Sequence, residues 1–263
     1  MAPRIEWRDL PGVVRAAVEA RTGPVLGVKS VSDGLTCAVA ARLDTAAGAL
    51  FVKGVRVEDR VGCEAQRWEA VVNSAVCAAS PSLRWSFTAE GWDVLVFDHV
   101  DGRHADLADG RDRRLVAEAL LAVENVGASV SVPRFAARFA GVLDREQLEL
   151  LGGTTLLHTD TNPHNLLVGG DRAWLVDWAM PASGPAWVDV AYTAVRLMEA
   201  DVPAREALGW TAQFLSWREA DPVAVEAFVT GVCRQWEARV GVAGARPSNA
   251  RFAALLGAMV IAP

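Results

Sequence analysis

The sequence predicts a two-lobed α+β fold, with a small antiparallel β-sheet lobe followed by a larger, mostly helical lobe. Short runs rich in β-branched and aromatic residues dominate the first hundred residues. Beyond them, apolar residues recur at three- and four-residue spacing, which is typical of helices. One hairpin signal, the turn Gly169-Gly170-Asp171-Arg172, lies among those helices. We therefore predict an N-terminal lobe over residues 1–100 and a C-terminal lobe over residues 101–263.

Two helices and five strands are expected in the N-terminal lobe. Asp9 is a plausible N-cap for the first helix, and Gly23 follows as its stop. A second helix, over residues 59–79, separates the third and fourth strands and ends before Pro81. The strands are predicted over residues 25–31, 37–43, 49–55, 82–88 and 92–100.

The C-terminal lobe is expected to be helical except for the hairpin. The two hairpin strands are predicted over residues 165–168 and 173–177. The helices are predicted over residues 111–126, 133–150, 185–199, 203–217, 222–240 and 247–261. Ligands favour the cleft between two such lobes.

Composition excludes several classes of protein. Of the 263 residues, 52% are hydrophobic and 22% charged, which rules out a disordered chain. The net charge of −6 argues against a nucleic-acid or anionic-membrane partner. The longest apolar run, residues 252–262, is about half of the roughly 20 residues that a membrane span needs. Glu6 and Asp9 interrupt the place of a secretory signal, and the four cysteines form no Cys-x-x-Cys pair, so we expect a cytoplasmic protein with reduced thiols.

The segment 156–178, LLHTDTNPHNLLVGGDRAWLVDW, carries the strongest functional signal. It places His158, Asp160 and Asn165 on a loop that leads into the hairpin. Because a two-stranded hairpin returns the chain to its start, Asp177 is expected to come close to Asn165. Two carboxylates and a carboxamide oxygen form a hard oxygen site that suits Mg²⁺.

A lysine in the third predicted strand is a second candidate. Strand alternation places Phe51 and Lys53 on one face of the sheet. An unpaired ammonium is costly to bury, so Lys53 needs an acidic partner. The following helix offers candidates at Glu58, Asp59, Glu64 and Glu69.

The pattern HxDxxxxN, followed by a hairpin and Asp177-Trp178, resembles the aminoglycoside phosphotransferase and choline kinase-like family of small-molecule kinases. The resemblance implies a protein-kinase-like fold, with ATP and Mg²⁺ as cofactors. It implies that Asp160 is the catalytic base, that Asn165 and Asp177 hold the metal, and that His158 supports the loop.

Further residues take roles by the same resemblance. Lys53 looks like the phosphate-binding lysine. The run Cys63-Glu64-Ala65-Gln66-Arg67-Trp68 favours Glu64 as its partner, with Glu69 as the alternative. Asp189 resembles the aspartate that braces the catalytic loop. The adenine-binding linker of the family resembles the segment Asp98, His99 and Val100. The turn that covers the phosphates resembles Ser32, Asp33 and Gly34, although the sequence contains no GxGxxG motif.

The resemblance implies transfer of the γ-phosphate of ATP to a small-molecule hydroxyl. An antibiotic acceptor is favoured over choline, homoserine or a sugar. The acidic helical lobe is compatible with a cationic acceptor, and the protein is expected to be a monomer or homodimer. A nucleotide-binding pseudokinase is one alternative. A metal-dependent hydrolase using His158, Asp160 and His164 is the other.

Overall fold

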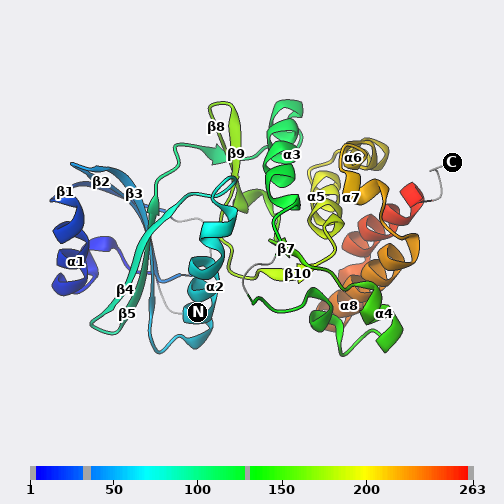
Figure 1. Ribbon diagram of the computed structural model, residues 1–263, viewed down its shortest axis with the longest axis horizontal. Helices are drawn as coiled ribbons and strands as arrows, with labels where there is room; N and C mark the ends of the chain where they lie inside the picture. The colour runs from blue at the N-terminus through cyan, green and yellow to red at the C-terminus, as the bar shows by residue number, and fades with distance from the viewer. Residues whose placement is uncertain (1–3, 32–36, 128–130, 260–263) are drawn as a thin grey trace.

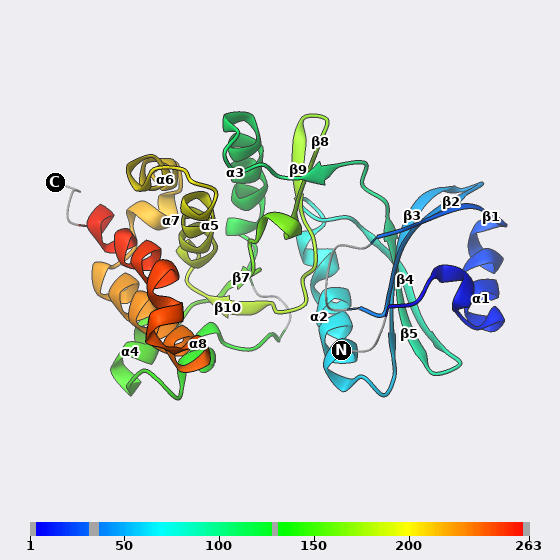
Figure 2. The same ribbon diagram turned by 180° about the vertical axis from the view of Figure 1, so that it is seen from behind.

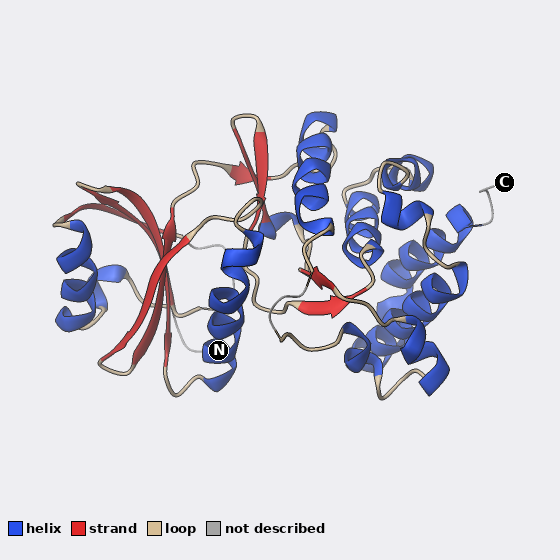
Figure 3. Cartoon of the chain, viewed as in Figure 1, coloured by secondary structure: helices blue, strands red, loops and turns tan. Residues whose placement is uncertain are grey.

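The computed structural model describes residues 4–31, 37–127 and 131–259. A twisted sheet forms one end of the molecule and a group of helices the other (Figure 1). Figure 3 shows the same division by secondary structure, with two small strand groups between the ends. In the described part, no helix is long and apolar enough to cross a membrane.

The N-terminal sheet is antiparallel throughout, with strand order β1-β2-β3-β5-β4. The five predicted strands are confirmed with small shifts at their ends. The second begins two residues later than expected. The strands are β1 (Val25–Ser30), β2 (Val39–Thr45), β3 (Gly48–Arg56), β4 (Leu83–Ala89) and β5 (Trp92–Asp98).

Helices α1 (Gly12–Thr22) and α2 (Arg60–Val76) lie on opposite faces of this sheet (Figures 1 and 2). Pro11, not Asp9, caps α1, because the chain first makes a 3₁₀ turn, η1 (Trp7–Asp9). Asp59 caps α2 by accepting a hydrogen bond from the N–H of Gly62. The face toward α1 buries alternate apolar residues of β2, β3 and β5 with those of α1, including Val14, Leu43 and Val52. Alternation therefore turns Phe51 and Lys53 to the other face.

The C-terminal part is mostly helical, with two small sheets of order β6-β8-β9 and β10-β7. The short strands β6, β7 and β10 were not predicted. Its elements are β6 (Arg103–His104), α3 (Gly110–Glu124), η2 (Phe135–Phe139), α4 (Arg145–Leu150), β7 (Thr155–Leu157), η3 (Pro163–Asn165), β8 (Leu166–Gly169), β9 (Arg172–Leu175), β10 (Ala182–Gly184), α5 (Trp187–Glu199), α6 (Ala204–Thr211), α7 (Leu215–Arg218) and α8 (Pro222–Met259).

Two of the predicted helices are each divided in the structure. The helix expected over 133–150 is η2 followed by α4, because Asp144 forms a capping box with Gln147 and starts a new helix. The helix expected over 203–217 divides into α6 and α7. The last two predicted helices are confirmed as separate helices: both lie within α8, whose backbone leaves the helical conformation at Gly241, where φ is 78° in the left-handed region.

The linker between the sheet and the helical part lies tightly against the hairpin. A Cβ on Gly169 would meet the carbonyl oxygen of Asp101 at 2.2 Å, so only glycine fits there. β6 also pairs with β8 directly after the linker. The hairpin that carries Asp177 is thereby held against the segment that leaves β5.

Candidate functional site

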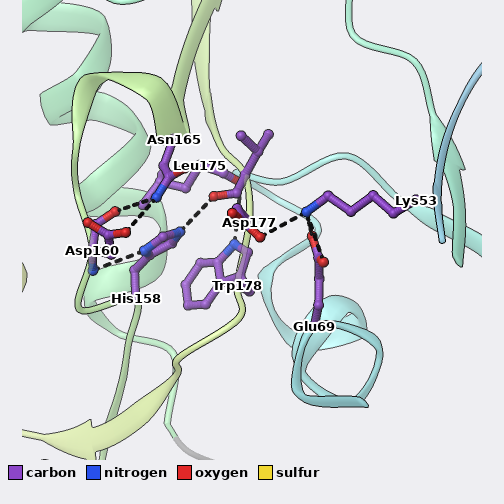
Figure 4. A network of polar contacts seen from close by, with 9 residues as sticks. Lys53, Glu69, His158, Asp160, Asn165, Leu175, Asp177 and Trp178 are labelled. Atoms are coloured by element: carbon purple, nitrogen blue, oxygen red, sulfur yellow. Dashed lines mark hydrogen bonds and ion pairs between the residues drawn. The ribbon is translucent and has the colours of Figure 1, made fainter. Parts of the chain in front are cut away.

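His158 holds the loop that carries Asp160 and Asn165 from within. It follows β7 and is almost completely buried. Its Nδ1 accepts a hydrogen bond from the N–H of Asp160 at 3.3 Å, so the ring proton lies on Nε2, which donates to the carbonyl oxygen of Val176 at 2.9 Å (Figure 4). The ring also contacts Trp178, with centroids 4.6 Å apart. Nε2 therefore joins the loop to the end of the hairpin, and Nδ1 fixes the turn of the loop at Asp160.

Asp189 braces the same loop from α5. Its two carboxylate oxygens accept hydrogen bonds from the backbone N–H groups of His158, at 2.7 Å, and Thr159, at 2.8 Å. Burial raises the pKa of Asp189, and the nearby His158 and the two N–H donors oppose that rise. The loop backbone is thus fixed by a buried side chain 30 residues further along the chain.

Two site residues have a left-handed backbone. Thr159 has φ of 68° and Asp177 has φ of 64°. The conformation is unusual for a β-branched residue such as Thr159, and it costs of the order of 1–3 kcal/mol. The surrounding hydrogen bonds must hold these residues in place.

Asp160 and Asn165 lie side by side, as the motif spacing predicted. The Asn165 amide nitrogen donates to the backbone oxygen and to Oδ2 of Asp160, both at 3.0 Å (Figure 4). The carboxamide is thereby oriented by the residue that it adjoins. Asp160 itself is half-buried.

Lys53 contacts two carboxylates, one from each lobe. Its Nζ contacts both oxygens of Glu69 at 3.0 Å and Oδ1 of Asp177 at 2.9 Å (Figure 4). Burial alone would lower the pKa of Lys53, but Glu69 and Asp177 raise it above the ordinary value. Burial also raises the pKa of Glu69, with Lys53 acting in the opposite direction.

The sequence favoured Glu64 as the partner of Lys53, but in the structure the partner is Glu69. The two glutamates are five residues apart on α2, which turns them about 140° away from one another around the helix axis. Glu69 faces the sheet and is 6% exposed, whereas Glu64 faces solvent. The run Cys63 to Trp68, which resembles the family's helix, therefore favoured a glutamate that faces away from Lys53.

A cavity of about 490 Å³ lies between the sheet and the hairpin. Its lining includes the polar residues Lys53, Asn165 and Asp177, together with the linker residues Asp98, His99 and Val100. Its apolar lining comes from both sides: Ala40, Phe51 and Phe97 from the sheet, and Leu167 and Val176 from the hairpin. The predicted Ser32, Asp33 and Gly34 lie outside the described residues.

Sequence reasoning missed one arginine at this site. The guanidinium of Arg138, on η2, donates to the hydroxyl of Thr159 at 2.7 Å and to the carbonyl oxygen of Met180 at 2.6 Å. Burial lowers the pKa of Arg138, and nearby Tyr192, Asp189 and Asp160 oppose that effect. No sequence signal marks it, because it lies in a segment that was predicted as an ordinary helix, 20 residues before the motif.

The hydrolase alternative does not fit this geometry. Both ring nitrogens of His158 are engaged, Nδ1 with the N–H of Asp160 in the loop and Nε2 with the carbonyl oxygen of Val176. The His164 ring packs edge-on against His104, with centroids 5.1 Å apart. Among the described residues, no group of three or more His, Cys, Asp or Glu side chains could hold a metal ion.

Comparison with known proteins identifies the family of this chain. The sequence model of the phosphotransferase enzyme family matches residues 97–228, from the end of β5 to α8. No curated protein matches the chain in sequence.

Solved structures share the fold over almost the whole chain. A thermostable mutant of the aminoglycoside phosphotransferase APH(4)-Ia, in ternary complex with AMP-PNP and hygromycin B, is 14% identical with a TM-score of 0.64 and covers 95% of this chain and 99% of its own. The choline kinase LicA from Streptococcus pneumoniae is 10% identical with a TM-score of 0.60, over 92% and 98%. The macrolide 2'-phosphotransferase MphH from Brachybacterium faecium is 17% identical with a TM-score of 0.52, over 94% and 98%.

Proposed function

The chain belongs to the phosphotransferase enzyme family, and we propose that it transfers the γ-phosphate of ATP to a hydroxyl group of a small molecule. One observation carries the proposal. A lysine of the sheet, Lys53, is ion-paired across the cavity to Asp177, whose hairpin also carries Asn165 beside Asp160. Phosphoryl transfer depends mainly on positioning and charge neutralisation, which are what this set of groups can supply.

The adenine ring is proposed to bind at the linker end of the cavity. Phe51 and Leu167 line the cavity from the two lobes, which offers apolar side chains on both sides of a base. Backbone groups of Asp98 to Val100 would hydrogen-bond the ring edge. The Asp98 carboxylate accepts a hydrogen bond from Arg84 at 2.6 Å, so the side chain is already engaged outside that role.

The phosphates are proposed to extend from the linker toward Lys53. Its ammonium is a compact point charge, suited to phosphate oxygens, and Glu69 fixes it in place. Ser32, Asp33 and Gly34 are proposed to add backbone N–H donors to the phosphates.

The residues present fit a magnesium ion. Asp177 offers carboxylate oxygen, and Asn165 commits its amide nitrogen to Asp160, which leaves its oxygen as the ligand atom. Mg²⁺ commonly takes one or two protein ligands and completes its shell with phosphates and water. The ion would supply neutralisation of phosphate charge. Lys53, Glu69, Asp177 and Asp160 together carry more negative than positive charge, which favours such a cation.

Asp160 is proposed to accept the proton of the acceptor hydroxyl and to orient its oxygen toward the γ-phosphate. General-base assistance of this kind contributes typically about 10²–10⁴-fold. Asn165 holds the carboxylate by donating to Oδ2. His158 and Asp189 support the reaction by fixing the loop backbone, and both are buried away from the cavity.

The acceptor is proposed to be a hydroxyl of an aminoglycoside-like or other antibiotic. Structural neighbours include an aminoglycoside phosphotransferase bound to hygromycin B and a macrolide phosphotransferase. The choline kinase neighbour supports a metabolite kinase as the second candidate. A cationic acceptor would suit the acidic surface of the helical part, and the cytoplasm would supply ATP and keep the four free cysteines reduced.

The test is an ATP-consumption screen over aminoglycosides, macrolides, cyclic peptide antibiotics, choline-like alcohols and sugars, with mass detection of an added phosphate. Phosphorylation of an antibiotic supports the favoured acceptor class, and phosphorylation of choline or a sugar supports the second. A thermal-shift measurement with ATP, with and without Mg²⁺, accompanies the screen. If ATP stabilises the protein without Mg²⁺ and no phosphate is transferred to any acceptor, the result favours a nucleotide-binding pseudokinase over an enzyme.

A further inference from the structure

Arg138 connects two loops that carry different parts of the proposed chemistry. One guanidinium nitrogen donates to the hydroxyl of Thr159, which directly precedes Asp160. The other donates to the carbonyl oxygen of Met180, three residues after Asp177. The Thr159 hydroxyl also donates to that carbonyl oxygen at 2.7 Å, so the three groups form a closed triangle.

We propose that Arg138 is a positioning residue that locks the Asp160 loop to the Asp177 loop through Thr159. The inference rests on the proposed function, because Asp160 and Asp177 must keep a fixed separation only if base and metal act on one phosphoryl group. The planar guanidinium presents its donors in a rigid fork, which suits two acceptors at a fixed spacing.

The lock explains an unusual residue in the motif. Thr159 occupies a left-handed position where glycine would be unstrained. Glycine carries no hydroxyl and could not take part in the triangle. The hydrogen bonds from Arg138 and to Met180 offset the strain that threonine brings, which links the two residues functionally.

Arg138 is itself held firmly. Its backbone oxygen accepts a hydrogen bond from Gln235 of α8, and its guanidinium lies 5.6 Å from the centroid of the Phe135 ring. The strand β10 fixes the start of the segment, because the N–H of Ser183 donates to Pro133 at 2.9 Å. A pre-organised cation of this kind can set the position of the loops rather than follow them.

The experiment compares Arg138→Gln, Arg138→Lys, Thr159→Gly and the double variant Arg138→Gln/Thr159→Gly, with Arg134→Gln as the matched control. Arg134 is an exposed arginine at the start of the same segment. Three quantities are measured: turnover of ATP with an acceptor from the screen, affinity for Mg²⁺·AMP-PNP, and melting temperature.

We expect Arg138→Gln to lower kcat about tenfold or more, because small misplacements of reacting groups are costly. Affinity for Mg²⁺·AMP-PNP is expected to stay within about twofold, since the lock touches neither Lys53 nor the cavity lining. Arg138→Lys should fall between wild type and Arg138→Gln, because an ammonium cannot reproduce the fork. The double variant should lose no more than the worse single variant, as expected for residues of one network.

The proposal would be overturned if Arg138→Gln had the same kcat as the control Arg134→Gln. It would also be overturned if the decrease in kcat of the double variant equalled the product of the decreases of the two single variants. Equal loss of kcat and of nucleotide affinity would also overturn it, because it would indicate a general structural role. If Arg138→Gln does not fold, Thr159→Gly and Arg138→Lys carry the same test. Failure of the proposed function gives a different result, namely that the wild-type protein transfers no phosphate to any acceptor. In that case the melting temperatures of the two single variants and the double variant still show whether Arg138 and Thr159 are coupled.

Discussion

The two halves of the site are held together by different kinds of interaction. The triad of Lys53, Glu69 and Asp177 consists of side-chain ion pairs, and the pair between Lys53 and Asp177 crosses between the lobes. The Asp160 loop is instead fixed through its backbone, by the buried carboxylate of Asp189 and the ring of His158. Ion pairs between side chains can exchange partners if phosphate and metal bind as proposed. A backbone held by buried acceptors cannot, so the proposed nucleotide side is adaptable and the side of the proposed base is rigid.

The largest effect is expected from Asp160→Asn, on the rigid side. The substitution keeps size and removes the proton acceptor, so kcat should fall by about 10²–10⁴-fold. Affinity for Mg²⁺·AMP-PNP, measured by titration calorimetry, should stay near that of wild type, because Asp160 does not line the cavity. Transfer at the wild-type rate would show that another group takes the proton.

Lys53→Met should act on both binding and turnover, in contrast to Asp160→Asn. Removal of one preorganised donor to the developing phosphate charge costs about 10²–10³-fold in kcat. Nucleotide affinity should weaken too, because the same ammonium is proposed to contact the phosphates of the bound nucleotide. The control is Lys29→Met, the other lysine of the sequence, which is exposed at the cavity edge. Equal effects of the two substitutions would contradict the role given to Lys53.

Asp189→Asn tests the rigidity of the base side through stability. One of the two buried N–H groups would lose its acceptor and face an amide donor, which costs about 1–3 kcal/mol of unfolding free energy. Urea unfolding measures the change. Asp171→Asn, in the fully exposed hairpin turn, is the control and should change stability by less than about 0.5 kcal/mol. An unchanged unfolding free energy in Asp189→Asn would show that this carboxylate does not hold the loop.

The smallest effect is expected from Glu69→Gln, compared with Glu64→Gln. Loss of one charged hydrogen bond on Lys53 corresponds to about a tenfold decrease in kcat/KM. Glu64→Gln should leave kcat/KM unchanged, because its side chain lies in solvent on the other side of α2. A larger decrease in kcat/KM for Glu64→Gln than for Glu69→Gln, measured by steady-state kinetics, would instead support Glu64 as the partner of Lys53.

Much of the fold could be predicted from local patterns. Strand alternation correctly placed Phe51 and Lys53 on the same face, and the Gly169-Gly170 turn correctly predicted the hairpin that brings Asp177 back to Asn165. The errors lie where the pattern depends on distant contacts. The strands β7 and β10 have three residues each, too few for a periodic signal, and form by pairing with one another.

The sequence by itself determined which chemical groups this site contains, because HxDxxxxN and Asp177 fix their types and their spacing along the chain. Tertiary structure alone decided which partners those groups have. Glu69 reaches Lys53 because packing sets the rotation of α2 against the sheet, and Arg138 reaches Thr159 because η2 is anchored to β10 and α8. Such choices depend on how whole elements pack, and neither residue spacing nor hydrophobic periodicity carries that information.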